Sequence, residues 1–372
     1  MRLRLAATAT VAGVVAFAAA ACGHPFTPAN YSPTRQYETI RPWTPPLPPL
    51  KGPMRVGVDL YDTQDYPVAQ TRALGERAIA YIADTLRVKS VGIAWDYVVP
   101  RANSRRVLSA SAATPVPADI AALTDIARAH GLSVQYRVLF EVAGMNGQSE
   151  QIKPPDTRVW LNSLLAAETP ALRLAQSEHV GEFVVGTEIP TIERSWLWDG
   201  FFSRAAKLYH GSLSYATWGG NPRSGGFFSA RRALTVPSEL YGVTAYPSVS
   251  LPPDAPVTRL TSDWKSFLAT APENVLRRTA IDEIGIPAND GMYADPWNWN
   301  AVTGTPDSRV QANWFTAACA AAEQEHMRAI YFWNVNLSDN PGLSRFASAE
   351  RFEGRPASEA AIRACVRSVG QR

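Results

Sequence analysis

Short apolar runs alternate with longer segments of helical periodicity along the chain from Met54 onward. The runs MRVGVDL and SVGIAW are typical of strands, and each is followed by an amphipathic run, QTRALGERAIAYIADTL and PADIAALTDIARAHG. Strand-like runs continue with LSVQYRVLF, EFVVGTEI, GSLSYATW, ELYGVTAY, RTAIDEI and RAIYFWNV. Helical runs such as SWLWDGFFSRAAKLYHG, SDWKSFLATAP and DSRVQANWFTAACAAAEQEH lie between them.

This alternation predicts eight strands in one parallel sheet. Eight strand–helix units fit a (β/α)8 barrel, also called a TIM barrel, which needs about 250 residues. The competing arrangement is an open, doubly wound sheet. That fold usually has a glycine-rich phosphate turn after its first strand, and GVDLYDTQDYP contains no G-x-G-x-x-G. We therefore expect an α/β protein with a single barrel domain over residues 54–372.

Residues 1–22 form a separate N-terminal segment. Two arginines precede LAATATVAGVVAFAAAAC, a run of small apolar residues that ends at Cys22. This is the layout of a secretory signal peptide, and AAAC resembles a bacterial lipobox, whose cysteine carries the lipid after cleavage. The alternatives are a plain signal peptide with Cys22 incidental and a single-pass membrane anchor. We expect an exported protein, either a lipoprotein on the outer face of the bacterial cytoplasmic membrane or a secreted one.

Residues 23–53 connect this signal to the barrel. They contain nine prolines and the run RPWTPPLPPLKGP, which favours an extended polyproline conformation over a helix or a central strand. We interpret them as a linker that holds the folded domain away from a membrane surface.

Composition and cysteine content limit the classes of partner, metal site and disulfide that we expect. The net charge of +3 is spread along the chain, so neither a nucleic-acid partner nor a strongly acidic substrate is indicated. Once Cys22 is assigned to a lipid, Cys319 and Cys365 remain. In an exported protein they could form a disulfide between the last two helices or stay as two buried thiols. Two cysteines cannot build a Cys-based zinc site, and we expect a monomer without a cofactor or a metal.

The carboxyl ends of the predicted strands hold the candidate site, because barrel active sites lie at that face. The residue motifs that other common catalytic chemistries need are missing from the sequence. The five histidines form no H-x-H or H-E-x-x-H pair, and the motifs G-x-S-x-G and G-x-x-x-x-G-K-[ST] are missing. Carboxylates and aromatic rings dominate the strand ends: Asp59, Asp62, Trp95, Asp96, Arg137, Glu141, Glu188, Trp218, Asn221, Tyr246, Glu283, Trp333 and Asn334.

Two of these residues form a candidate acid pair. Glu188 ends the fourth strand and Glu283 the seventh, and these strand ends face each other across a closed eight-stranded barrel. Glycoside hydrolysis uses two carboxyls, one to protonate the leaving oxygen and one to attack or to activate water. Two close carboxylates raise one pKa, so one acid stays protonated. Either acid alone would indicate a salt bridge or a helix cap. Strand alternation turns the adjacent Asp282 away.

The same segments resemble a known family. GTE at strand four, DEIG at strand seven and the tryptophan of YFWN at strand eight are similar to the retaining barrels of glycoside hydrolase clan A. More narrowly, ATPVPADIAALTDIARAHGLSVQYRV, VVGTE, LSYATW, GVTAYP, AIDEIG and FEGRPA resemble family 113, whose members include β-1,4-mannanases. The resemblance spans about Gly57 to Ala357, nearly the whole expected domain.

The resemblance implies roles for individual residues. It makes Glu188 the acid/base, Glu283 the nucleophile, Trp333 the platform under the sugar, and Tyr246 a neighbour of the nucleophile. These roles are chemically sensible, because a Trp ring binds the C–H face of a pyranose and a Tyr hydroxyl can hold a carboxylate. Further substrate-binding candidates at the strand ends are Trp218, Arg137, Trp95, Asp59 and Asn334.

The sequence departs from clan A at two positions. Most members have an Asn before the acid/base, where it binds the sugar 2-hydroxyl, and this chain has Thr187. The second strand has no Arg near its end. We therefore expect Arg137 of the third strand to supply the cation near the nucleophile, or else to pair with Glu141 or Glu188.

Tryptophans also occur in the connections. The segment NDGMYADPWNWNAVTGTPDS after strand seven contains Trp297 and Trp299. We interpret it as a substrate-binding wall, with a hydrophobic lid on the barrel as the alternative. Trp196 and Trp198 have helical spacing and are expected to serve packing.

Two functions follow from these patterns. The first, which the acid pair favours, is an exported retaining glycoside hydrolase acting on mannan, another β-linked poly- or oligosaccharide, or a cell-wall glycan. The second is a non-catalytic carbohydrate-binding or cell-wall scaffold lipoprotein on the same barrel, which needs the tryptophans but not both acids. A metal-dependent hydrolase is disfavoured because the histidines are misplaced.

Overall fold

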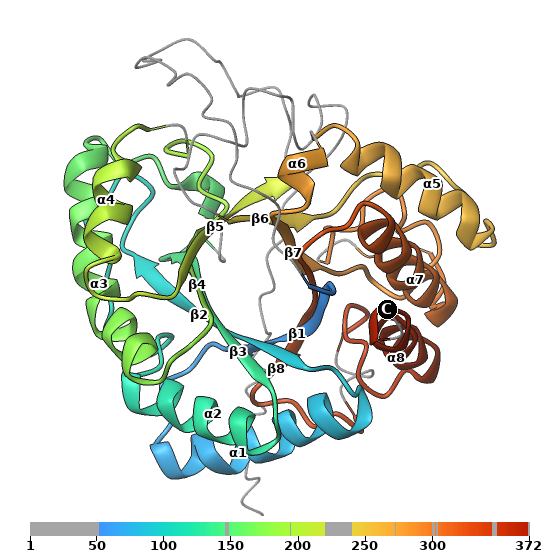
Figure 1. Ribbon diagram of the computed structural model, residues 1–372, viewed down its shortest axis with the longest axis horizontal. Coiled ribbons are helices and arrows are strands. Elements are labelled where there is room, and N and C mark those ends of the chain that lie inside the picture. The colour runs from blue at the N-terminus through green and yellow to red at the C-terminus, as the bar shows by residue number, and fades with distance from the viewer. Residues whose placement is uncertain are drawn as a thin grey trace, which may run out of the picture.

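Eight parallel strands close into a barrel in the computed structural model of the protein (Figure 1). Each strand pairs with the next along the chain, and β8 pairs with β1. This topology confirms the predicted (β/α)8 barrel and excludes the open sheet. The strands are β1 (Arg55–Asp62), β2 (Ser90–Val99), β3 (Ser133–Val142), β4 (Glu182–Thr187), β5 (Ser212–Gly219), β6 (Tyr241–Ala245), β7 (Thr279–Ile284) and β8 (Ala329–Asn336).

The structure describes residues 52–145, 149–193, 195–219, 240–271, 273–299, 302, 304–343 and 348–370. The signal-like segment with Cys22, the proline-rich run as far as residue 51, and Asn221 lie outside these ranges. Within them, none of the helices has the length and apolar character that crossing a membrane requires.

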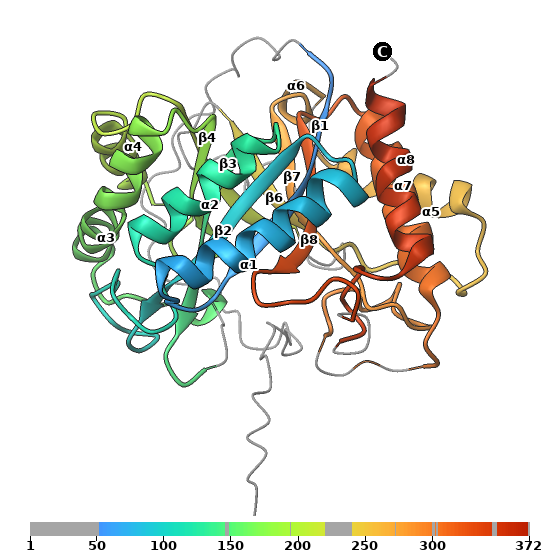
Figure 2. The same cartoon turned by 90° about the horizontal axis from the view of Figure 1, so that it is seen from below.

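Helices surround the barrel on its outer side (Figures 1 and 2). A π-helical turn, η2 (Tyr81–Thr85), continues the first helix, and a 3-10 turn, η3 (Ser149–Gln151), follows β3. The α-helices are α1 (Val68–Ala80), α2 (Pro117–Ala129), α3 (Thr157–Ser177), α4 (Trp198–Ala205), α5 (Val257–Leu268), α6 (Glu273–Leu276), α7 (Ser308–Gln324) and α8 (Pro356–Gly370).

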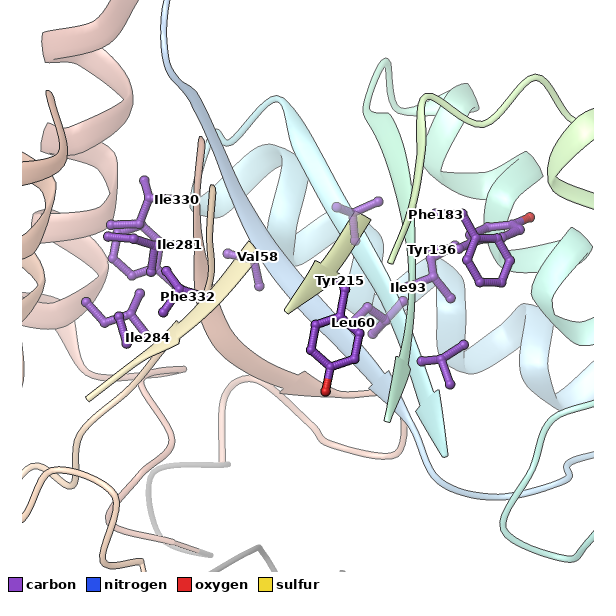
Figure 3. Packing of buried hydrophobic residues seen from close by; sticks show 14 of the residues in the cluster. Val58, Leu60, Ile93, Tyr136, Phe183, Tyr215, Ile281, Ile284, Ile330 and Phe332 are labelled. Atoms are coloured by element: carbon purple, nitrogen blue, oxygen red, sulfur yellow. The ribbon is translucent and has the colours of Figure 1, made fainter. Parts of the chain in front are cut away.

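The main hydrophobic core lies between the strands and these helices. Successive strand residues point to opposite faces, so every second apolar side chain is turned outward. Val58 and Leu60 of β1 and Ile281 of β7 belong to this layer and are fully buried (Figure 3). The residues between them point into the barrel, which leaves the interior free for polar side chains.

Side-chain caps fix the start of two helices that follow strands. Asp156 accepts a hydrogen bond from Val159 N–H at 3.0 Å before α3, and Asp307 accepts one from Arg309 N–H at 2.9 Å before α7. Each cap satisfies an N–H that has no partner within the first turn. The connections from β3 and β7 therefore end at defined residues.

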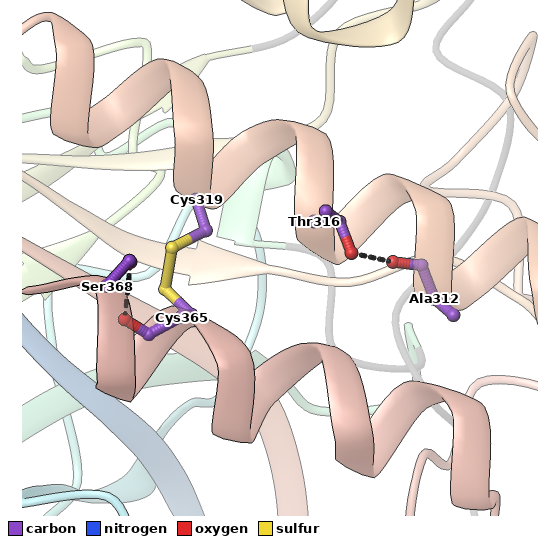
Figure 4. The surroundings of a disulfide bond; sticks show 5 residues. All are labelled: Ala312, Thr316, Cys319, Cys365 and Ser368. Carbon is purple, nitrogen blue, oxygen red and sulfur yellow. Dashed lines mark hydrogen bonds between the residues drawn. A yellow bond between two sulfur atoms is a disulfide. The ribbon is translucent and has the colours of Figure 1, made fainter. Parts of the chain in front are cut away.

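A disulfide joins α7 to α8 (Figure 4). Cys319 and Cys365 are bonded, with Cα atoms 5.8 Å apart and a sequence separation of 46 residues. The bond encloses β8 and its connection to α8, so it ties the last strand–helix unit to the preceding helix. Of the two alternatives that the sequence left open, the structure has the disulfide and not two separate thiols.

Candidate active site

Glu283, near the end of β7, is held by two hydrogen-bond donors. Arg137 Nη2 of β3 donates to Glu283 Oε2, and the Tyr246 hydroxyl, just after β6, donates to Glu283 Oε1. Burial, and then the charge of Glu283, raise the pKa of Tyr246, so the phenol keeps its proton and can donate it. A cation and a hydroxyl on the same carboxylate stabilise its ionised form. Both oxygens of Glu283 are therefore held, one by Arg137 and the other by Tyr246.

Glu188, directly after β4, has a different environment. Burial, and then the charge of Glu283, raise its pKa well above the usual value, while a hydrogen bond from Thr244 lowers it. Its backbone adopts φ 57°, in the left-handed region, and its N–H donates to Ala216 O of β5 at 2.9 Å. This conformation turns the chain out of the strand at Glu188. The two carboxyls thus lie within electrostatic reach, and Glu188 favours the protonated form.

One group of aromatic rings lies beside this pair on β1 and β8. The rings of Tyr61 and Trp333 are 4.9 Å apart between centroids. The guanidinium of Arg137 lies 4.9 Å from the centroid of the Trp333 ring, a cation–π distance. Trp333, the predicted sugar platform, is therefore next to the arginine that binds Glu283.

A second aromatic group lies on β5, β6 and the connection after β7. Trp218 stacks on Tyr246 with centroids 5.8 Å apart, and Trp297 meets Trp218 edge-on at 6.3 Å. Trp299 meets Tyr246 edge-on at 5.7 Å. Gly285 makes room for Trp299, because a Cβ there would lie 2.7 Å from the ring. Both connection tryptophans are half-buried against site residues, as a substrate-binding wall requires.

Three predicted site residues occupy other places. Trp95 is fully buried outside the barrel, 5.5 Å from the Tyr136 ring, because alternation along β2 turns it outward. Asp59 is fully buried inside the barrel and accepts a hydrogen bond from Arg137 at 2.8 Å, so it supports that arginine and lines no surface. Asn334 is buried, and its side-chain oxygen accepts from Arg351. Substrate contact by Trp95 and Asp59 was a wrong prediction, and contact by Asn334 stays a prediction.

A β-bulge corrects the expectation for Asp282. The pairing of β7 with β6 joins Ile281 to Val243 but Glu283 to Thr244, so Asp282 is an extra residue in the ladder. Its side chain points into the barrel, where Gln135 Nε2 donates to it at 3.3 Å. The bulge lets two consecutive acids point inward, which strict alternation forbids.

Asp96 and Tyr61 form a pair to which the sequence assigned no role, although Asp96 was named among the strand-end residues. The Tyr61 hydroxyl donates to Asp96 Oδ2. Burial raises the pKa of Asp96 to about 7, although the hydrogen bond from Tyr61 lowers it. Asp96 is one position beyond Trp95, so choosing the inward residue of that pair would have found it.

A floor cluster lies at the amino ends of the strands and consists of Glu182, Arg55, Arg328 and Ser214. Glu182 Oε2 accepts from Arg55 at 2.8 Å and Glu182 Oε1 from Arg328 at 2.8 Å, while Ser214 donates at 2.7 Å. Every donor points at one carboxylate. The cluster fills the end of the barrel away from Glu283.

The chemistry of the site is that of acids, a guanidinium and phenols. Among the residues that the structure describes, no group of three or more His, Cys, Asp or Glu side chains could hold a metal ion. A protonated carboxyl can donate a proton to a leaving group, and an ionised carboxyl beside it can attack an electrophilic carbon.

Comparison with known proteins identifies the family. The model of Glycoside Hydrolase Family 113 matches residues 70–341, which is most of the chain. The chain belongs to glycoside hydrolase family 113. It is accordingly a glycoside hydrolase, as the resemblance of its strand ends implied. No curated protein matches it.

Solved structures agree in fold. A family 113 β-1,4-mannanase has 16% identity and a TM-score of 0.72, over 86% of this chain and 100% of that one. The family 113 β-mannanase AaManA from Alicyclobacillus acidocaldarius, in complex with ManMIm, has 18% identity and a TM-score of 0.68, over 85% and 97%. A family 5 protein, GH5_18 from Streptomyces cattleya in complex with GlcNAc, has 14% identity and a TM-score of 0.54, over 86% and 81%.

Proposed function

We propose that this protein is a retaining glycoside hydrolase that cleaves a β-linked poly- or oligosaccharide, with Glu188 as acid/base and Glu283 as nucleophile. The observation that carries the proposal is the unequal environment of the two carboxyls. Glu283 is bound by Arg137 and Tyr246, whereas burial and the charge of Glu283 raise the pKa of Glu188. This is the division that acid catalysis and nucleophilic attack require.

The geometry supports a two-step reaction. Glu188 gives its proton to the glycosidic oxygen, the bond from that oxygen to the anomeric carbon breaks, and Glu283 forms an ester with the same carbon. Water then gives a proton to Glu188 and attacks the anomeric carbon, which releases Glu283. As Glu283 loses its charge in the first step, Arg137 and Tyr246 remain beside it and bind the returning carboxylate in the second.

The aromatic rings support a pyranose substrate. Trp333 presents an indole ring beside Arg137. Trp218 and Trp299 contact Tyr246, and Trp297 meets Trp218 edge-on. Indole faces bind the C–H faces of sugar rings. Because the similar family 113 structures are β-mannanases, we propose a β-1,4-linked mannan or a related cell-wall glycan as substrate.

We further propose that the enzyme acts outside the cytoplasmic membrane. The signal-like segment ends in AAAC, and a proline-rich segment that contains nine prolines separates Cys22 from the barrel. Lipid attached to Cys22 would anchor the enzyme, and the linker would extend the barrel toward glycans in the envelope. Globomycin treatment of cells that express the full chain tests the anchor, because the uncleaved precursor accumulates only if Cys22 is processed as a lipoprotein.

A substrate panel tests the reaction. Wild type, Glu188→Ala and Glu283→Ala are assayed on β-mannan, other β-glycans and aryl glycosides. We expect wild type to hydrolyse at least one β-mannan substrate. Glu283→Ala should be inactive on every substrate. Glu188→Ala should retain most of its kcat/KM only on aryl glycosides whose leaving groups need no proton, and its kcat should fall on these as well because water in the second step has lost its base. Full activity of Glu283→Ala would contradict the proposal, and a folded wild type that binds but never cleaves would favour the scaffold function.

A further inference from the structure

Arg137 crosses the barrel to reach Glu283, and its anchors lie on other strands. It starts on β3, and its Nη1 donates both to Asp59 Oδ2 of β1 at 2.8 Å and to the backbone oxygen of Asp282 on β7. Trp333 of β8 covers the guanidinium. Only Nη2 of Arg137 reaches Glu283. The position of this nitrogen is thus set by acceptors that bind Nη1.

Asp59 has space for this role because its neighbour on β2 is a glycine. Asp59 pairs with Gly92 in the sheet register. A methyl group on Gly92 would overlap Asp59 Oδ1 and come within 3.4 Å of Gln135 Oε1. The interior at this level therefore accommodates the carboxyl of Asp59 only while residue 92 has no side chain.

Stability alone accounts poorly for this arrangement. Asp59 Oδ1, Gln135 Oε1, Asp282 Oδ2 and Arg137 Nε are all buried and have no hydrogen-bond partner among the described residues. Buried polar atoms without partners cost stability, and apolar side chains of similar volume often replace buried ion pairs without loss. A cluster that is costly to bury and ends on the nucleophile is better explained by the reaction.

We propose that Asp59 is a positioning residue for the reaction, fixing Arg137 so that Nη2 holds the carboxylate of Glu283 in its attacking orientation. This inference rests on the proposed function, because it takes Glu283 as the nucleophile. Asp59 touches neither sugar nor Glu283 and acts through Arg137. Its loss should therefore lower kcat and leave KM nearly unchanged.

Three variants separate positioning from folding. Asp59→Ala removes the acceptor, Asp59→Asn keeps an oxygen of the same reach without the charge, and Gly92→Ala keeps every charge but displaces Asp59. Gly200→Ala on α4 is the matched control, since a methyl group there has nothing within 4 Å. The fraction of competent active sites is measured with a 2-fluoro-β-mannooligosaccharide fluoride, which forms an ester on Glu283. Mass spectrometry after complete labelling gives the fraction of protein that carries the ester, and the kcat of each variant is expressed per labelled site.

We expect kcat per labelled site to fall about 100-fold in Asp59→Ala with KM within about threefold, and to recover about tenfold in Asp59→Asn. Gly92→Ala should lose at least about tenfold, and Gly200→Ala should match wild type. If Asp59→Ala does not fold, the kcat per labelled site of Gly92→Ala tests the positioning role of Asp59.

Unchanged kcat per labelled site in Asp59→Ala or Gly92→Ala would overturn the positioning role and leave the proposed function intact. An active wild type that is not labelled on Glu283 would instead overturn the proposed function, and the inference with it.

Discussion

Two buried acid–arginine clusters lie in the same barrel and differ in the ratio of their charges. The floor cluster directs two arginines and a serine at Glu182. The site cluster, defined as Arg137, Asp59, Asp282 and Glu283, places three acids around one arginine. Asp59 and Glu283 form ion pairs with Arg137, and Asp282 accepts from it through its backbone oxygen. Both use side chains that point inward from the strands, and both are shielded by the same outer apolar layer.

The ratio decides how each carboxyl titrates. Burial acts to raise the pKa of Glu182, but the charges and hydrogen bonds of Arg328 and Arg55 outweigh it and lower the pKa to about 2. Asp282 has no such surplus of cations, so burial, and then the charge of Glu182, raise its pKa to about 7. Charge at the floor is therefore fixed at all ordinary pH values, whereas charge at the site can respond to a proton.

The largest effect should follow a change in the site cluster. Glu283→Ala removes the proposed nucleophile, and we expect kcat/KM to fall on the order of 10⁴-fold or more. Thermal unfolding should show that the fold survives. Steady-state kinetics on the best substrate of the panel measure the loss, and a variant that stays within tenfold of wild type would break the functional distinction between the two clusters.

The opposite pattern is expected at the floor. Glu182→Ala leaves Arg328 buried without its counter-charge, and we expect about 3–5 kcal/mol less free energy of unfolding with kcat per folded molecule unchanged. Because the folded pKa of Glu182 is lowered from an ordinary 4.5 to about 2, its stabilisation is present above pH 4.5 and is lost as pH falls toward 2. Urea unfolding at several pH values should show this acid-dependent loss in wild type and a weaker one in Glu182→Gln.

A change distant from both clusters gives a reference for pure destabilisation. Replacing Cys319 and Cys365 with Ser opens the loop across α7 and α8. We expect about 2–4 kcal/mol less stability, with kcat unchanged at temperatures where the variant is folded. Calorimetry with matched kinetics checks this, and a lowered kcat would show that the α8 side of the barrel supports the site.

The smallest effect concerns the electrostatic coupling of the Glu188 and Glu283 carboxyls. Burial is the main reason that the pKa of Glu188 is raised, and the charge of Glu283 is the next. Glu283→Gln removes only that charge, so the pKa of Glu188 should fall and stay above its ordinary value. ¹³C-NMR titration of labelled glutamate, with Glu188→Gln as the assignment control, measures the shift. An unchanged pKa would mean that the two carboxyls do not interact.

The hydrophobic periodicity of the sequence predicted most of the fold. Alternating strands and helices predicted the closed barrel, and the order of Glu188 and Glu283 placed two acids on opposite strand ends. The comparison with clan A made Arg137 the candidate cation near Glu283, with pairing to Glu141 or Glu188 as the alternative, and Arg137 binds Glu283. These predictions succeed because strand ends in a barrel converge whatever the loops do.

Two of the errors share one physical cause, which is the direction of a side chain at a strand end. Trp95 was chosen where Asp96 points inward, and Asp282 was turned outward where a bulge turns it in. A bulge shifts the alternation by one residue and leaves no reliable mark in the sequence. Glu182 was overlooked because it begins its strand, and its partners Arg55 and Arg328 are distant in sequence.

The proposed mechanism requires that the carboxyl bound by Arg137 and Tyr246 attacks the sugar. Mass spectrometry of the peptide that contains Glu283, after wild-type enzyme is incubated with the 2-fluoro glycoside and digested, tests this step. We expect one added glycosyl group, located on Glu283 by fragmentation and absent from the Glu283→Gln variant. A glycosyl group on any other residue, or complete turnover of natural substrate by enzyme that never acquires the label, would contradict it.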